Sequence, residues 1–232
     1  MWFALNFGIS LILLYPFFYV SLSKPEWYPK AFVLKRAWAK WILYVTGIFV
    51  TVKNIENLKK VSKPCIFCAN HTSYLDIVLC YMLIPDYFTF MGKAELLKAP
   101  LFSIFFSSGM DIAVERKSRI GAHQAFLRAA AEIDKGHSMF MFPEGTISSD
   151  GVMKQFKNGA FKLAIDKQVE VVPITFKNNW KILQNGGFFK SNGRPGILRV
   201  VIHEPISTKG TNELFLPHLK EQVYNVIAES LK

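Results

Sequence analysis

The stretch CIFCANHTSYLDIVLCYML, residues 65–83, joins a short apolar run to an apolar helical pattern. The run CIFCAN, residues 65–70, is bounded by turn-forming and polar residues and reads as a buried strand. Residues 74–83 follow with the spacing of a helix. A strand that passes directly into a helix is the repeating unit of layered α/β proteins, so this stretch predicts an α/β fold.

The same alternation continues along the rest of the chain. Further strands are expected at residues 88–91, 111–114, 138–142, 169–176 and 198–202. Further helices are expected at residues 101–107, 121–135, 161–167 and 214–231. We therefore predict an α/β fold whose mixed, largely parallel sheet is flanked by helices. In such sheets ligands bind beyond the carboxyl ends of the strands.

The amino-terminal segment differs from the rest of the chain. Residues 1–23 contain no charged side chain, and residues 2–22 are long enough to cross a hydrocarbon core, which takes about 20 residues. A cleavable signal is not expected, because no basic residue precedes the run. Pro16 would kink or break a helix there, so a full span and a re-entrant hairpin both remain open.

A second apolar helix is expected at residues 31–51, with Trp38 and Trp41 near its basic end, as suits a membrane interface. An ordinary core helix is the alternative. We expect two units, a membrane-associated helical module at residues 1–51 and an α/β domain at residues 52–232.

Positive charges gather after the first apolar run, at Lys24, Lys30, Lys35, Arg36 and Lys40. By the positive-inside rule they place the remaining chain on the cytoplasmic face of the inner (plasma) membrane.

The composition favours lipid over nucleic acid as a partner. Hydrophobic residues make up 51% of the chain and Phe alone numbers 21, enough for a large core and a second apolar environment. The formal net charge of +11 comes from scattered Lys and Arg with no nucleic-acid recognition motif. Such a surplus beside an apolar segment fits membrane lipids, so we expect a membrane-bound protein and no nucleic acid.

The three cysteines, Cys65, Cys68 and Cys80, do not predict a disulfide framework. An odd number without a cleavable signal argues for a reducing compartment. Cys65 and Cys68 form a CxxC inside an apolar run, and no second ligand pair accompanies them. We interpret them as buried strand residues and predict no metal site and no cofactor.

The segment NHTSYLD, residues 70–76, carries candidate catalytic residues at the junction of strand and helix. The imidazole of histidine titrates near neutral pH, so His71 could act as a general base. Asp76, about one helical turn further on, could hold the other ring nitrogen. A hydroxyl-bearing substrate would then supply the nucleophile. By spacing alone, helix capping is the usual explanation of such a pair.

The segment FPEGTIS, residues 142–148, directly follows an expected strand. A strand that ends in Pro-Glu-Gly-Thr gives a tight loop whose backbone N–H groups and hydroxyls can cradle an anion. Glu144 could orient a ligand hydroxyl or a basic neighbour. A structural turn is the alternative.

Taken together, these segments resemble the glycerophospholipid acyltransferase family, in particular the bacterial lysophosphatidic acid acyltransferases. The NHxxxxD motif is matched by Asn70, His71 and Asp76. The family's second region, a Lys before Glu-Leu followed by a Gly and then an Arg, resembles the stretch with Lys93, Glu95 and Leu96, then Gly109 and Arg116. FPEGT with a following Ser is matched by Phe142–Thr146 and Ser148, and Val-Pro-Ile by Val172, Pro173 and Ile174. FKNGAFKLA, residues 156–164, is also similar to the family.

The resemblance implies that His71 is the general base and Asp76 its partner. It implies that the acceptor pocket is lined by Lys93, Arg116, Glu144, Gly145, Thr146 and Ser148, and that Pro173 shapes the acyl-donor side. The implied reaction moves a fatty acyl group from acyl-CoA or acyl carrier protein to the sn-2 hydroxyl of lysophosphatidate, giving phosphatidate.

The chain departs from the family at Ile147, where many members that act on a phosphate-bearing acceptor have Arg. Either Lys93, Arg116, Lys154 or Lys157 supplies the charge, or the acceptor is a lysolipid without a phosphomonoester. Two other functions were weighed. A hydrolase would use the same base to activate water, although the chain has no G-x-S-x-G elbow. A non-catalytic membrane protein would bind acidic lipids through its basic surface.

Overall fold

The computed structural model describes residues 2–148, 150–185 and 192–232. Its strands are β1 (Ile48–Lys53), β2 (Ile66–Ala69), β3 (Phe88–Lys93), β4 (Ile112–Val114), β5 (Ser138–Met141), β6 (Val171–Phe176) and β7 (Gly196–Ile202). Its α-helices are α1 (Trp2–Ser21), α2 (Tyr28–Val45), α3 (Leu75–Leu83), α4 (Ile104–Ser107), α5 (Arg119–Asp134), α6 (Gly159–Lys167), α7 (Asn179–Ile182) and α9 (Leu216–Leu231).

The strands form one sheet in the order β1-β7-β6-β2-β5-β3-β4. Only β6 and β7 run antiparallel among its adjacent pairs, and the other pairs are parallel. The predicted α/β fold with a mixed, largely parallel sheet is therefore confirmed. β2 lies near the middle of the sheet, between β6 and β5, so the turn that follows it begins at the centre of the sheet edge.

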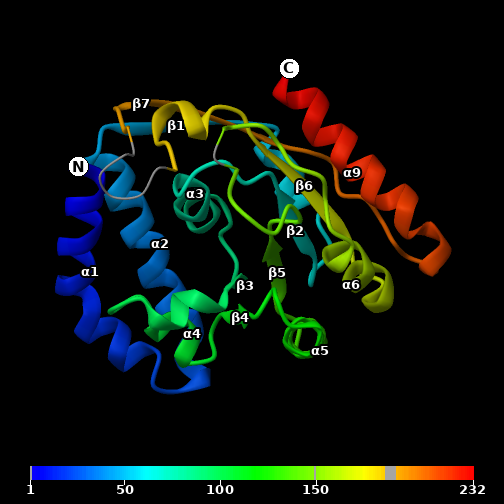
Figure 1. The fold of residues 1–232 in the computed structure, drawn as a ribbon, viewed down its shortest axis with the longest axis horizontal. Helices are drawn as coiled ribbons and strands as arrows, with labels where there is room; N and C mark the ends of the chain where they lie inside the picture. The colour runs from blue at the N-terminus through cyan, green and yellow to red at the C-terminus, as the bar shows by residue number, and fades with distance from the viewer. Residues whose placement is uncertain (1, 149, 186–191) are drawn as a thin grey trace.

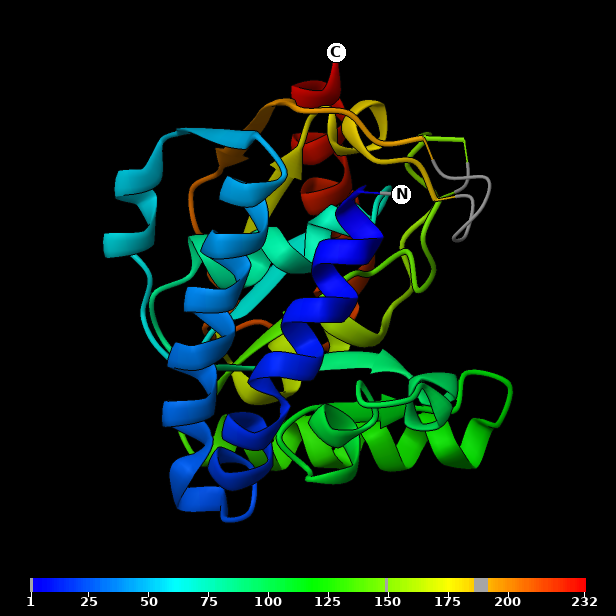
Figure 2. The same cartoon turned by 90° about the vertical axis from the view of Figure 1, so that its left-hand side faces the viewer.

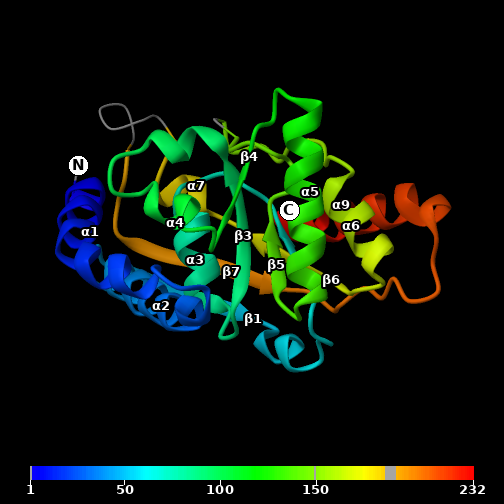
Figure 3. The ribbon, with the colours of Figure 1, turned by 90° about the horizontal axis from the view of Figure 1, so that it is seen from below.

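Helices cover both faces of the sheet, and β2 supplies side chains to each face in turn. Phe67 and Ala69 belong to the apolar cluster beneath α2 and α3, whereas Ile66 and Cys68 belong to the cluster beneath α5, α6 and α9. Figure 1 shows α1 and α2 on one side of the molecule and α6 and α9 on the other. Figure 3 shows α5 lying alongside β5. Two-sided coverage explains why β2 reads as an unbroken apolar run.

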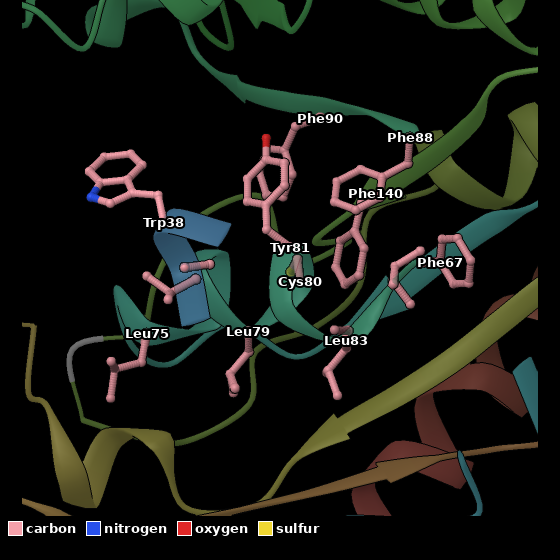
Figure 4. Packing of buried hydrophobic residues seen from close by; sticks show 14 of the residues in the cluster. Trp38, Phe67, Leu75, Leu79, Cys80, Tyr81, Leu83, Phe88, Phe90 and Phe140 are labelled. Atoms are coloured by element: carbon pink, nitrogen blue, oxygen red, sulfur yellow. The ribbon is translucent and has the colours of Figure 1, made fainter. Parts of the chain in front are cut away.

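Aromatic rings fill the core between α3 and the sheet (Figure 4). Phe90 and Phe140, on strands β3 and β5, stack with ring centroids 5.9 Å apart. Tyr81 on α3 stacks on Phe88 at 5.1 Å. Burying a side chain of this kind contributes roughly 1.5–3 kcal/mol, so these rings hold α3 firmly on the sheet.

The amino-terminal run forms one continuous helix, α1, with Pro16 inside it. Pro16 therefore does not break the helix. Figure 2 shows α1 lying beside α2, and the Trp38 indole N–H donates to Ser10 Oγ at 2.8 Å between them. Among the described residues, α1 is the single helix that is long and apolar enough to cross a membrane. Its outer side chains are exposed, with Leu13 67% accessible.

The prediction of one helix through residues 31–51 was wrong. α2 ends at Val45, where Thr46 Oγ1 donates to the Ile42 carbonyl at 2.7 Å and Gly47 follows with a φ of +66°. A glycine in the left-handed region is a common helix terminator. Residues 48–53 then form β1, which pairs with β7. The expected boundary after residue 51 thus falls inside a strand of the sheet.

α2 has one buried and one exposed face. Ala31, Phe32 and Ile42 are buried against the rest of the core, as the alternative of a core helix requires. Val33 and Tyr44 point outward and are 62% and 76% exposed. The inner face makes α2 part of the fold, and its insertion in a membrane stays a proposal.

A buried ion pair links α2 to the body. Lys35 Nζ lies 2.6 Å from Asp111 Oδ2, and both side chains are 4% exposed. Lys35 also donates to the Tyr81 hydroxyl at 3.1 Å, and Asp111 Oδ1 accepts the Phe90 backbone N–H at 3.1 Å. Each charge depends on the other, because an unpaired charge in this position is costly.

We expect Asp111→Asn to destabilise the protein by about 3–5 kcal/mol, since it leaves the Lys35 ammonium buried without a counter-charge. Asn can still accept the Phe90 N–H. Adding Lys35→Met to this variant removes the unpaired charge and should restore part of the lost stability. Thermal unfolding of the two variants and the wild type in detergent tests this; equal midpoints for all three would contradict it.

Candidate active site

The turn after β2 is fixed to the neighbouring strand by Asn70. Its side-chain amide donates to the Phe176 carbonyl at 3.0 Å and accepts the Phe176 N–H at 2.8 Å. Both partners are buried. Asn70 thus continues the pairing of β2 with β6 by one residue, and it sets the position from which His71 leaves the sheet.

His71 and Asp76 form the pair that the sequence predicts. His71 Nδ1 lies 2.9 Å from Asp76 Oδ2, and the Asp76 carboxylate is fully buried. The same oxygen accepts the backbone N–H groups of Thr72 and Ser73 at 2.7 and 2.9 Å. Asp76 therefore holds the turn and the imidazole together, which goes beyond the capping alternative.

Asn179 at the start of α7 completes the surroundings of this carboxylate. Its side-chain amide donates to Asp76 Oδ1 at 2.5 Å. Its own Oδ1 is buried without a hydrogen-bond partner among the described residues. Such an orphaned acceptor costs free energy, so the contact with Asp76 has to compensate for it. The sequence analysis missed Asn179, because no local pattern connects it to a residue 103 positions earlier.

The imidazole of His71 lies flat on the ring of Phe142. The two ring centroids are 3.8 Å apart and the planes differ by 5°. Phe142 follows β5, next to β2 in the sheet. The ring of His71 is therefore held in its plane by Phe142 and turned within that plane by Asp76. The sequence placed Phe142 in a motif but gave no sign of this stacking.

Glu144 joins the loop after β5 to the turn after β2. Its carboxylate accepts the His71 N–H at 2.6 Å and the Lys154 N–H at 2.8 Å. Burial raises the pKa of Glu144 to about 7, although these two donors lower it. The nearby charge of Asp76 raises it as well. Glu144 thus binds the backbone of the turn after β2 and the backbone at Lys154, so it holds the loop after β5 against that turn.

The other predicted site residues of this loop are Gly145, Thr146 and Ser148. Gly145 has a φ of +73°, which favours glycine, and the side chain of Lys157 lies against it. The Ser148 N–H donates to the His71 carbonyl at 2.8 Å. Thr146 is exposed, whereas Ser148 is buried. The loop of residues 142–148 therefore packs directly on the turn that carries His71.

His71 opens into a cavity of about 870 Å³ that lies between the sheet and the amino-terminal helices. Apolar side chains dominate its wall, including Phe7, Trp38, Ile42 and Phe105. Of the described residues, its charged side chains are Lys35, Lys93, Glu95, Asp111, Arg116 and Arg194. A long apolar ligand could thus lie against α1 and α2 with one end at His71.

The structure brings some predicted site residues into this cavity and leaves others behind it. Those that line it are His71, Lys93, Arg116 and Thr146. Asp76, Glu144, Gly145 and Ser148 support its wall from behind. Pro173 does not line it: both its neighbours on β6, Val172 and Ile174, pack in the cluster on the cavity side, so Pro173 faces away.

The arrangement suits proton abstraction from a hydroxyl. One ring nitrogen of His71 is bound to a carboxylate, which leaves the other available as a base toward the cavity. In the described part of the chain, no group of three or more His, Cys, Asp or Glu side chains is placed to hold a metal ion. All three cysteines are buried, and burial raises the pKa of the Cys65 thiol to about 12.

Comparison with known proteins places this geometry in context. A family model described as Acyltransferase matches residues 49–177. The chain is 33% identical over 180 residues to a chloroplastic 1-acyl-sn-glycerol-3-phosphate acyltransferase of Brassica napus, over 78% of this chain and 50% of that protein. It is 30% identical over 173 residues to a 1-acyl-sn-glycerol-3-phosphate acyltransferase of Borreliella burgdorferi, over 75% of this chain and 67% of that one.

The chain spans about half the length of the first curated relatives it matches, which are plant and algal proteins. A similar fold occurs in the crystal structure of the 1-acyl-sn-glycerophosphate acyltransferase of Thermotoga maritima. The TM-score is 0.75 at 23% sequence identity, over 97% of this chain and 95% of that one. This likeness establishes the fold and extends it to the amino-terminal helices.

The raised pKa of Glu144 predicts a pH-dependent stability. An unfolded glutamate titrates near pH 4.3, so the native state retains a proton that the unfolded state has released between about pH 4.3 and 7. The contribution of Glu144 is full below this window and is lost as the pH rises through it. At about 1.4 kcal/mol per pKa unit, the loss from pH 5 to 8 is roughly 2–3 kcal/mol.

Glu144→Gln provides the reference, because the amide does not titrate in this range. We expect the stability of the wild type relative to Glu144→Gln to fall as the pH rises from 5 to 8. Unfolding of both proteins across this range measures the difference, and other titrating groups cancel from it. A difference that stays constant with pH would show that Glu144 is ionised throughout.

Proposed function

Since this chain belongs to the acyltransferase family, we propose that it transfers a fatty acyl group from acyl-CoA or acyl carrier protein to the sn-2 hydroxyl of lysophosphatidate, forming phosphatidate. The observation that carries the proposal is the His71–Asp76 pair at the mouth of a large apolar cavity. The names of the matched relatives support the acceptor.

In this reaction His71 is the general base and Asp76 orients it. Asp76 Oδ2 accepts from Nδ1, so the lone pair lies on Nε2. The acceptor hydroxyl gives its proton to Nε2 while its oxygen attacks the thioester carbonyl. The C–S bond then breaks, and the departing thiolate takes the proton back from Nε2. The sum is one ester formed and one thiol released, with no other reactant.

The tetrahedral intermediate needs hydrogen-bond donors for its oxyanion. The N–H groups of Thr72 and Ser73 at the turn are already bound to Asp76. The N–H groups of Thr146 and Ile147 have no partner within the described residues, and both residues line the cavity. We therefore assign the oxyanion donors to the loop after β5, with Glu144 and Gly145 holding its shape.

The cavity and the outer helix faces suit a lipid substrate. The apolar wall from α1 and α2 would hold the acyl chain. The exposed apolar side chains of α1, among them Ile12, Leu13 and Phe17, would lie in the bilayer. We place α1 and the outer face of α2 in the inner membrane, as the membrane-associated module, and the α/β domain on its cytoplasmic face.

His71→Ala should lower kcat by about 10²–10⁴-fold, the usual contribution of general-base catalysis. Thiol release from a long-chain acyl-CoA, followed in detergent with lysophosphatidate, measures it. The control is His123→Ala, which removes an exposed histidine of α5 and should leave the rate unchanged. Full activity of His71→Ala at an unchanged melting temperature would exclude His71 as the base.

The same assay separates the alternatives. Thiol release without an acceptor would indicate hydrolysis, and activity only with a lysolipid that lacks the phosphomonoester would change the acceptor. Activity only with acyl carrier protein would assign the donor. If the wild type releases no thiol with either donor, the protein is not an acyltransferase and lipid binding alone remains.

Asn179→Ala should lower kcat about tenfold with little change in KM, since the lost donor to Asp76 loosens the orientation of His71 without touching the cavity. Asn178→Ala is the matched control, because the neighbouring amide hydrogen-bonds to the β7 backbone instead. Similar losses in both variants would mean that the segment is needed only for folding.

A further inference from the structure

Within the described residues, four cationic side chains line the cavity, and they differ in whether a carboxylate lies close enough to pair with them. Lys35 pairs with Asp111 at 2.6 Å, and Lys93 pairs with Glu95 at 2.8 Å. Arg116 and Arg194 have no carboxylate within 4.0 Å in the described ranges of the chain. Burial lowers the pKa of Arg116, and the charge of Glu95 raises it. Within the described residues, Arg194 is therefore the cavity cation for which no carboxylate partner is found.

Arg194 lies outside the segment matched by the family model and in none of the motifs found in the sequence. It comes from the stretch just before β7. Its backbone N–H donates to the Ile182 carbonyl at 2.9 Å, and its Nε donates to the Lys181 carbonyl at 3.0 Å. The end of α7 thus fixes both its main chain and the first nitrogen of its guanidinium.

This stretch is also tied to the turn that carries His71. Gly193 forms a bridge with Leu183, and the Leu183 carbonyl accepts the hydroxyl of Ser73 at 2.7 Å. A short series of hydrogen bonds therefore connects Arg194 to the residue two places after His71. The main chain at Arg194 is thus tied both to the end of α7 and to the turn that carries His71.

The two terminal amino groups of Arg194 have no hydrogen-bond partner among the described residues. Their N–H groups form the planar fork that binds phosphate oxygens in pairs. The lysines near Ile147 are placed differently. Lys154 Nζ approaches the Ile147 carbonyl at 3.4 Å, and Lys157 lies against Gly145. Neither lines the cavity.

We propose that Arg194 binds the phosphomonoester of the acceptor and gives the enzyme its preference for a phosphorylated lysolipid. This inference rests on the proposed function. A phosphomonoester carries up to two negative charges, and the terminal N–H groups of Arg194 can bind two of its oxygens at once. Ile147 leaves the loop after β5 without a cation in the cavity wall, and Arg194 supplies one from the stretch before β7.

The test compares Arg194→Gln with the wild type on two acceptors, lysophosphatidate and monoacylglycerol. Loss of one hydrogen bond to a charged group lowers the affinity for a ligand by about tenfold to a hundredfold. We expect KM for lysophosphatidate to rise by that factor, with kcat, KM for acyl-CoA and the rate with monoacylglycerol unchanged. Arg194→Lys should recover part of the loss, because it keeps the charge without the fork.

Arg199→Gln is the matched control, since it removes an exposed arginine of β7 that does not line the cavity. An unchanged KM for lysophosphatidate in Arg194→Gln would overturn the inference and leave the proposed function intact. A higher KM for acyl-CoA alone would assign Arg194 to a phosphate of the donor and also overturn it. A wild type that does not acylate lysophosphatidate would defeat the proposed function itself.

Discussion

The buried carboxylate of Asp76 is the constraint on which the site depends. A charge taken out of water costs several kcal/mol unless partners replace its hydration. Asp76 has four donors, from His71, Thr72, Ser73 and Asn179. Three of them come from the turn after β2, so satisfying the charge folds that turn into one shape. The fourth comes from α7, so the same charge also fixes how α7 meets the turn.

A second buried carboxylate lies on the other side of His71 and behaves differently. Glu144 accepts two backbone N–H groups, against four donors for Asp76, and burial raises its pKa to about 7. The charge on Asp76 adds to this effect. Two acids close to one histidine therefore have separate tasks. Asp76 orients the imidazole, whereas Glu144 fastens the loop after β5 and need not be ionised to accept hydrogen bonds.

The sequence pattern predicted those helices and strands whose structure depends on residues close by in the chain. Residues 65–83 were placed correctly as a strand and a helix, because burial on two faces and helical spacing both leave a signal in the order of residues. Residues 48–51 were assigned to a helix, since an apolar run next to a helix does not reveal that β7 pairs with it. Asn179, Phe142 and Arg194 gained their roles from contacts with residues far away in sequence, and no spacing could have indicated these contacts.

The cavity explains why the amino-terminal helices belong to the site and not only to an anchor. The rings of Phe7 and Trp38 lie with their centroids 4.9 Å apart, and both residues line the cavity together with Ile42. The opposite faces of the same helices expose apolar side chains, among them Leu13 of α1 and Tyr44 of α2. An acyl chain that left a bilayer through water would lose about 0.8 kcal/mol for each exposed CH₂ group. If it instead moves along α1 and α2, it exchanges one apolar surface for another. In the proposed reaction, the two helices would thus join the membrane to His71 by a path that keeps the chain out of water.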